Sequence, residues 1–337
     1  MRLSDFDYDL PLELIAQEPI EQRDESRLLT VDRAVGKLEH HVFGDIVDLL
    51  RSDDLLVLND TRVTAARLHG KKRSGGKVEA LLMCKLDGAR YEAMVKPGRR
   101  VDVGQELVFG DGNLTAEVVE RTDIGGRILE FSSESDCETL ISNLGEVPLP
   151  PYIHRPLADR ERYQTIYARS GGSAAAPTAG LHFTPELLEK IRNKGVRTTF
   201  VTLHVGIGTF RPVRCENVLD HEMHSETISI SSDAAEMINS HKGRVVVVGT
   251  TTARALESAA VEKGKVKPAL METRLFMTPG YEFKIVDALV TNFHMPKSTL
   301  LILVSALAGR DLIQKAYAEA VKERYRFLSF GDAMFIQ

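Results

Sequence analysis

Apolar residues near both ends of the chain form short runs, and most of these runs end in a polar turn. Residues 244–248 (RVVVV) are almost all β-branched, the pattern of a strand buried on both faces of a parallel sheet. Residues 198–204 (TTFVTLH) and 55–58 predict two more buried strands. Helices are predicted over residues 159–167, 185–194, 253–261 and 300–307. This alternation of strands and helices indicates an α/β fold with helices covering the sheet.

The middle of the chain has a different pattern. Strand-like runs follow one another here, separated by glycine-containing turns such as Asp87-Gly88, and helical periodicity is absent. The runs are residues 77–85, 89–95, 106–109, 114–120 and 126–131. Such spacing predicts a small antiparallel β-barrel. After the barrel, a proline-rich stretch is expected to be extended. We therefore predict a discontinuous three-layer α/β domain, residues 1–67 and 150–337, with an inserted barrel domain, residues 68–149.

Two histidines lie in turns of one predicted helix and strand unit. Small residues over 174–180 precede His182, and His204 ends the strand of residues 198–204, before Gly206 and Gly208. Ligands bind at such turns in open α/β sheets. A histidine at a strand end is more often a hydrogen-bonded structural residue, but two turns with so little side-chain bulk favour a pocket.

Three more polar turns are expected at the same edge of the sheet. Residues 59–62 (NDTR) follow one buried strand, and residues 249–252 (GTTT) follow another and begin a helix. A glycine and threonine turn that begins a helix offers free N–H groups to an anionic or hydroxyl-rich ligand, although it lacks the Walker and GxGxxG patterns. The third turn contains Asn292, His294 and Lys297 around Phe293, and its polarity favours function over packing.

The segment RDESR near the N-terminus holds Arg23, Asp24 and Arg27 in a loop before a short strand. These side chains form either a structural ion-pair network or a clamp for an anion, and the sequence does not distinguish the two.

Charge is distributed unevenly, although the net charge of the 337 residues is only −5. Residues 60–100 contain 11 Lys and Arg against 4 Asp and Glu, a balance of +7. This basic segment is a candidate face for phosphate contacts, and its alternative interpretation is a solvated charged surface.

Composition indicates an ordinary globular protein, with 43% hydrophobic and 27% charged residues. No apolar run reaches the roughly 18 residues that span a bilayer, and the N-terminus is acidic, so we expect no membrane association and a cytoplasmic location. Three scattered cysteines predict neither disulfides nor a cysteine zinc site. The segment HEMHSE (221–226) lacks the HExxH spacing, so we expect no metal.

Several stretches together resemble the S-adenosylmethionine:tRNA ribosyltransferase-isomerases of queuosine biosynthesis. The resemblance extends through nearly all of the α/β part and brackets the barrel. It is carried by RDESRLL, VLNDTRVTAARL, PLPPYIHRP, DRERYQTIYA, AAPTAGLHFT, VTLHVGIGTFRPV, HEMHSE, VGTTTARALESAA, PGYEFKIVDALVTNFHMPKSTLLILVSALAG and YRFLSFGDAM. The chain departs from the family at Met295, where leucine is usual, and over residues 269–273.

The resemblance implies a transferase that consumes S-adenosylmethionine as a ribosyl donor. The family moves the ribosyl group onto 7-aminomethyl-7-deazaguanine at the wobble position of a tRNA anticodon and isomerises it, which leaves epoxyqueuosine and releases adenine and methionine. The implied partners are S-adenosylmethionine and that tRNA, with no further cofactor and no metal. We expect a monomer or a weak homo-oligomer.

This reaction needs a base, an acid and groups that hold the ribose. Histidine suits proton transfer near neutral pH, so the candidates for catalysis are His182, His204 and His294, without an assignment of base and acid. The candidates for substrate binding are Thr250, Thr251 and Asn292 for polar contacts, Arg254 or Lys297 for the methionine carboxylate, Asp60 and Arg62 as orienting groups, and Phe183 and Phe293 for stacking on the RNA base. The alternatives are a zinc-dependent hydrolase that uses the histidines and a non-catalytic RNA-binding module.

Overall fold

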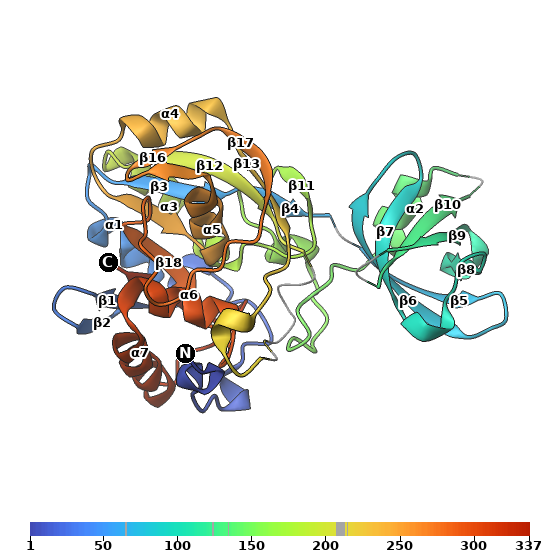
Figure 1. Ribbon diagram of the computed structural model, residues 1–337, viewed down its shortest axis with the longest axis horizontal. Helices are drawn as coiled ribbons and strands as arrows, with labels where there is room; N and C mark the ends of the chain where they lie inside the picture. Colours follow the sequence, from blue (N-terminus) through green and yellow to red (C-terminus); the bar gives the residue numbers. More distant parts are fainter. Residues whose placement is uncertain (65, 123–124, 134, 207–212, 214) are drawn as a thin grey trace. The chain divides into compact units, whose positions relative to one another are not determined.

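The computed structural model describes residues 1–64, 66–122, 125–133, 135–206, 213 and 215–337 (Figure 1). Contacts within the chain divide it into two compact units. The α/β unit comprises Met1–Thr61, Pro150–Ser170 and Ala176–Gln337. The barrel unit comprises Arg62–Leu149 and Gly171–Ala175.

A large mixed sheet forms the centre of the α/β unit. Its strands, in spatial order among the described residues, are β17 (Ala269–Thr273), β13 (Glu226–Ile230), β12 (Arg197–His204), β3 (Leu55–Asn59), β14 (Val245–Val248), β18 (Ala288–Asn292), β19 (Ala333–Ile336), β1 (Arg27–Asp32) and β2 (Lys37–Val42). The four central strands β12, β3, β14 and β18 are parallel to one another. All of β3, β14 and β18 is buried, which explains why they appear in the sequence as continuous apolar runs.

Helices cover both faces of this sheet. They are α1 (Ile46–Leu49), α3 (Pro185–Asn193), α4 (Ser232–Ser240), α5 (Thr250–Ala259), α6 (Thr299–Ala308) and α7 (Arg310–Lys322). On one face, Leu187 and Ile191 of α3 pack with alternate strand residues such as Leu56 and Val248. Helix α5 contacts the same strands but contributes nothing to that cluster, so it lies on the opposite face. The predicted α/β class is confirmed.

The edge formed by the carboxyl ends of the central strands collects the polar turns. Because β12, β3, β14 and β18 are parallel, His204, Asn59, Gly249 and Asn292 lie at one edge of the sheet. Strand β19 is antiparallel to β18 and parallel to β1, so the beginnings of β19 and β1 lie at this edge as well.

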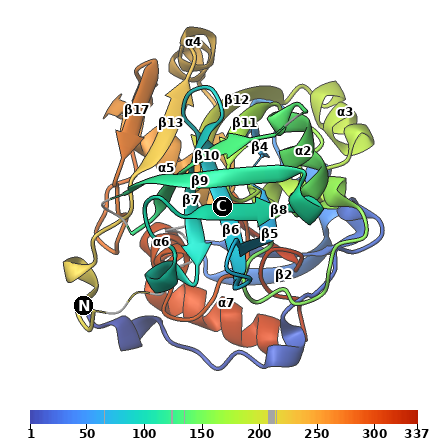
Figure 2. The same cartoon turned by 90° about the vertical axis from the view of Figure 1, so that its right-hand side faces the viewer.

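The barrel unit is a closed antiparallel barrel whose described strands follow the order β10-β7-β6-β5-β8-β9 (Figure 2). Their bounds are β5 (Arg67–Lys72), β6 (Lys77–Lys85), β7 (Arg90–Lys96), β8 (Glu106–Phe109), β9 (Leu114–Arg121) and β10 (Arg127–Ser132). The predicted barrel is confirmed. Helix α2 (Cys137–Leu144), which follows the last strand of the barrel, was not predicted. Asp136 caps α2, and Ile141 is its one buried residue, so its eight residues carry little periodicity.

Shorter elements complete the chain. They are β4 (Thr61–Val63) with β11 (Ser170–Ser173), β15 (Ala260–Glu262) with β16 (Lys265–Val266), and 3-10 turns that include η7 (Arg160–Tyr163) and η8 (Thr178–His182). The helix expected over residues 159–167 is only the short turn η7. Among the described residues, no helix combines the length and apolar character that crossing a bilayer requires.

Candidate functional site

Helix α5 begins at the polar edge without a side-chain cap. Gly249 is its N-cap residue, with φ of 88°, a conformation that glycine adopts without steric cost. The N–H groups of Thr250, Thr251 and Thr252 precede the first intrahelical bond, which Ala253 donates to Gly249, and they have no partner among the described residues. The start of α5 therefore offers free donors and the positive end of the helix dipole.

A pocket opens at this helix start. It is an open pocket that combines polar and apolar lining residues. Polar groups come from the first turn of α5 and from the segment before β13, and apolar side chains come from the segment after β17 and from α6. The lining residues are His221, Met223, His224, Glu226, Thr250, Thr251, Arg254, Leu275, Phe276, Met277, Thr299, Leu300 and Leu303. We call it the α5 pocket.

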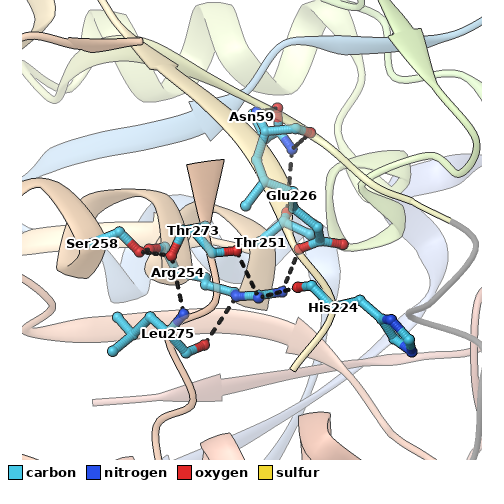
Figure 3. Close-up of polar contacts among 9 residues, drawn as sticks. Asn59, His224, Glu226, Thr251, Arg254, Ser258, Thr273 and Leu275 are labelled. Atoms are coloured by element: carbon cyan, nitrogen blue, oxygen red, sulfur yellow. Dashed lines mark hydrogen bonds and ion pairs between the residues drawn. The ribbon is translucent and has the colours of Figure 1, made fainter. Parts of the chain in front are cut away.

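The wall of the α5 pocket contains a buried ion pair, shown in Figure 3. Arg254 pairs with Glu226, and the exposed fractions of the two side chains are 9% and 3%. The guanidinium also donates to the carbonyl oxygens of Leu275 (3.0 Å), His224 (3.0 Å) and Thr273 (3.3 Å). Arg254 was predicted to bind a substrate carboxylate, but these bonds use four of its five N–H donors. It ties β13 and the end of β17 to α5.

Two neighbours extend this framework. Asn59 donates to the hydroxyl of Thr251 at 3.3 Å, which links the end of β3 to the start of α5. One turn after Arg254, the buried carboxylate of Glu257 accepts the N–H groups of Lys284, Ile285 and Val286. One face of α5 therefore holds the segments on both sides of residues 275–277, which form the apolar wall of the pocket.

His204 is half-buried, unlike the other two candidate histidines. Its Nδ1 lies 2.8 Å from the hydroxyl of Thr61, and its Nε2 has no partner among the described residues. Burial lowers the pKa of His204, while the nearby Asp60 carboxylate acts in the opposite direction. Asp60 is buried and accepts bonds of 2.6 Å from both Arg169 and Thr202. His204 can therefore exchange a proton with a ligand. Gly208 lies outside the described residues.

His182 is enclosed on the face of the sheet that α3 covers. Its Nδ1 lies 2.7 Å from the hydroxyl of Ser26, its Nε2 lies 3.2 Å from the amide of Asn292, and its ring stacks on Phe43. Burial, and then the charges of Arg23 and Arg326, lower its pKa to about 3. Both ring nitrogens are occupied, so His182 is a neutral packing residue. Phe183 is fully buried beside Phe43 and cannot stack on a base.

His294 lies on the opposite face of the sheet. It bonds Thr291 through Nε2, whereas His182 bonds the next residue, Asn292, and successive strand residues point to opposite faces. Burial lowers the pKa of His294 to about 3. The expected convergence of His182, His204 and His294 is therefore limited to a shared edge.

Phe293 and Lys297, the other two candidate residues of this turn, also make contacts within the protein. Phe293 is fully buried against Tyr317, Tyr325 and Phe327, so it is not available to a base. Lys297 pairs with Asp7 at 2.6 Å and is not part of the α5 pocket lining. The turn packs against the N-terminal segment.

Comparison with known proteins decides the family. The model of the family described as queuosine biosynthesis protein matches residues 3–336. The chain belongs to this family. It is 58% identical to the S-adenosylmethionine:tRNA ribosyltransferase-isomerase of Symbiobacterium thermophilum and 54% identical to that of Desulforamulus reducens, each over 100% of both chains. The crystal structure of the S-adenosylmethionine tRNA ribosyltransferase from Thermotoga maritima is similar with a TM-score of 0.56 and 41% identity, over 99% of this chain and 100% of that one.

The basic segment of residues 60–100 is neutralised by acidic residues of the barrel unit. Arg67 pairs with Glu79, Arg73 with Glu106 and Arg90 with Glu130. The whole unit contains 13 Lys and Arg against 14 Asp and Glu, a balance of −1. Arg62, the predicted orienting group, belongs to this unit. The local excess of positive charge in the sequence is not an excess of the folded unit.

Sequence reasoning on this family member found the start of α5 but missed most of the pocket. Thr250, Thr251 and Arg254 were identified, and the structure brings them together. Phe276, Met277 and Thr299 carry no local signal, because isolated apolar and hydroxyl residues occur throughout the chain. Glu226 had been considered only as part of a metal motif. No group of three or more His, Cys, Asp or Glu side chains could hold a metal within the described part of the chain.

Proposed function

We propose that this protein transfers the ribosyl group of S-adenosylmethionine onto 7-aminomethyl-7-deazaguanine in the wobble position of tRNA and isomerises it to epoxyqueuosine, with release of adenine and methionine. The observation that carries the proposal is identity of 53–58% over the full length of relatives named S-adenosylmethionine:tRNA ribosyltransferase-isomerase. The zinc-dependent hydrolase and the non-catalytic RNA-binding module are not favoured, because these relatives carry the name of a transferase.

The α5 pocket is the proposed site for S-adenosylmethionine. The free N–H groups at the start of α5 suit the methionine carboxylate, since they combine hydrogen-bond donors with the positive end of the helix. Hydroxyls of Thr250 and Thr251 are available to the ribose, and Phe276, Leu300 and Met277 offer apolar surface to the adenine or the methionine chain. Arg254 and Glu257 act through the pocket wall as positioning residues.

His204 is the proposed proton-transfer residue. Removal of a proton beside the sulfonium carbon and protonation of departing adenine both need a group that changes its protonation state near neutral pH. The burial of His182 and His294, with pKa values of about 3, leaves them neutral under these conditions. His204 is half-buried and has a ring nitrogen that no described residue contacts. Thr61, held by the end of β3, fixes the ring through its other nitrogen.

The remaining parts of the proposal follow the family. The protein acts in the cytoplasm as a monomer or weak homo-oligomer, and S-adenosylmethionine is consumed as a co-substrate without a further cofactor.

The test incubates the purified protein with S-adenosylmethionine and a tRNA carrying 7-aminomethyl-7-deazaguanine, followed by mass spectrometry of free bases and of digested nucleosides. We expect adenine and epoxyqueuosine in equal amounts. A matched tRNA with guanine at the wobble position is the control and should release no adenine. Folded protein that releases none from the modified tRNA would refute the proposed function.

A further inference from the structure

The arginines of the RDESR segment point in different directions. Arg27 donates to the carbonyl of Glu323 and lies 3.7 Å above the ring of Tyr325. Arg23 instead donates to the carbonyls of Leu181 at 3.3 Å and Glu161 at 3.1 Å. Neither arginine forms an ion pair with Asp24 among the described residues, so the segment is not an internal ion-pair network.

Arg162 of η7 lies beside Arg23. It donates to the carbonyls of Ile20 and Glu21, and its buried Nε has no partner among the described residues. The two guanidinium groups are close enough that the charge of Arg162, after burial, lowers the pKa of Arg23. Asp159 and Glu161 act in the opposite direction, but within the described part of the chain no carboxylate lies within 4 Å of either guanidinium. Two neighbouring cations are therefore held by neutral carbonyl groups.

These two arginines line a small pocket with Ser329, Gly331 and Leu181. The hydroxyl of Ser329 lies 2.7 Å from that of Tyr152, which fixes its position. His182, also in the lining, is neutral, and none of the described lining residues is acidic. The carbonyl bonds use two of the five N–H donors of each guanidinium, so both groups can still donate to an anion. Two such cations and a hydroxyl, with no carboxylate among the described lining residues, suit a phosphate group.

We infer that Arg23 and Arg162 form a site for a backbone phosphate of the tRNA substrate. The inference rests on the proposed function for the identity of the ligand. The site adjoins the beginning of β1, and the α5 pocket adjoins the end of β14, three strands away along the same sheet edge. At a strand spacing of about 4.8 Å, three strands correspond to about 14 Å along this edge, and the thickness of the sheet adds to the separation because the two sites lie on opposite faces.

This site would position the RNA without reading its sequence. The barrel unit has no net positive charge, so phosphate binding within the α/β unit supplies an attraction that the predicted basic segment does not. Loss of the site should raise the KM for tRNA and leave kcat unchanged at saturating tRNA, because no atom of the site takes part in the chemistry.

The experiment measures binding of an unmodified tRNA transcript to Arg23→Gln and Arg162→Gln by fluorescence anisotropy at several salt concentrations. For each variant, the slope of log K against log salt should become shallower by about 0.7, and affinity at 0.1 M salt should fall about fivefold. Binding of S-adenosylmethionine should be unchanged, and circular dichroism should show that both variants are folded. Arg310→Gln, which removes an exposed arginine paired with Asp311, is the matched control and should bind as the original protein does.

Unchanged slopes and affinities in the folded variants would overturn the inference. If the variants fail to fold, phosphate ethylation interference on the unaltered protein serves instead. One or two phosphates near the wobble position should then block binding when modified, and a uniform profile would overturn the inference. These are binding measurements, so failure of adenine release in the unaltered protein would refute the proposed function alone.

Discussion

Replacement of Arg254 by methionine distinguishes a residue that binds substrate from one that builds the pocket. Methionine keeps much of the length and apolar volume of the arginine but removes the guanidinium. The carboxylate of Glu226 then loses its buried counter-ion, and the carbonyls of His224, Thr273 and Leu275 each lose a donor. The exposed fractions of 9% and 3% leave water little access to either charge.

The expected effect is large because a buried charge is left without its partner. Breaking such a pair from one side destabilises a protein by about 3–5 kcal/mol. For a unit of this size, each kcal/mol lowers the melting temperature by about 2–4 °C, so the decrease should be about 6–20 °C. Had Arg254 only bound a substrate carboxylate, as its place in the sequence suggested, stability would change by less than about 0.5 kcal/mol and only binding would suffer.

Thermal unfolding followed by circular dichroism, with and without S-adenosylmethionine, measures this effect. The double variant Arg254→Met/Glu226→Gln should recover about 1–3 kcal/mol of the loss, because it removes the stranded charge. Arg192→Met, an exposed arginine on α3, is the matched control and should melt within about 2 °C of the original protein. A similar small change in Arg254→Met would show that the buried pair does not hold the pocket wall.

Three further results are expected. His204→Gln should abolish adenine release while the melting temperature stays within about 2 °C, and full turnover in this variant would exclude the proposed proton transfer. Glu257→Gln weakens the clamp on Lys284, Ile285 and Val286, so it should lower stability by about 1–3 kcal/mol and raise the KM for S-adenosylmethionine more than it lowers kcat. The pKa of His182 is about 3 in the folded chain against about 6.5 unfolded, so only the unfolded state takes up a proton as the pH falls below 6.5, and stability decreases by about 1.4 kcal/mol per pH unit. His182→Gln should therefore show a shallower loss between pH 6.5 and 5 in acid unfolding, and an equal slope would contradict this origin.

The sequence was sufficient for the architecture where the signal is local. Alternation within residues 77–85 and 106–109 predicted β6 and β8 with their observed bounds, and continuous β-branching predicted β14. The 13-residue helix α7 was missed, although its buried residues Ile313, Ala316, Tyr317 and Ala320 follow helical spacing; two of the four are alanines, which give a weak hydrophobic signal.

The site was less predictable because burial and pairing depend on distant residues. Arg254 stands near the start of a helix, but its counter-ion is 28 positions away on β13, a strand that was not predicted. Phe293 follows a strand among polar residues, yet three aromatic rings from the last third of the chain enclose it. The sequence predicted His182 and His294 at the same edge of the sheet. In the structure they bond successive strand residues, Asn292 and Thr291, which point to opposite faces, so the two imidazoles lie on opposite faces of the sheet.

The backbone conformation of Gly249 prevents a side-chain cap at the start of α5. A serine or aspartate at this position would satisfy an amide of α5, and such a cap is worth about 1 kcal/mol, but the φ of 88° strains any residue with a Cβ atom. The first amides of α5 therefore depend on solvent or a ligand for a hydrogen-bond acceptor. Under the proposed function, part of the binding free energy of S-adenosylmethionine comes from hydrogen bonds to these amides. A substitution that capped the helix from within the chain would then stabilise the protein and weaken that binding.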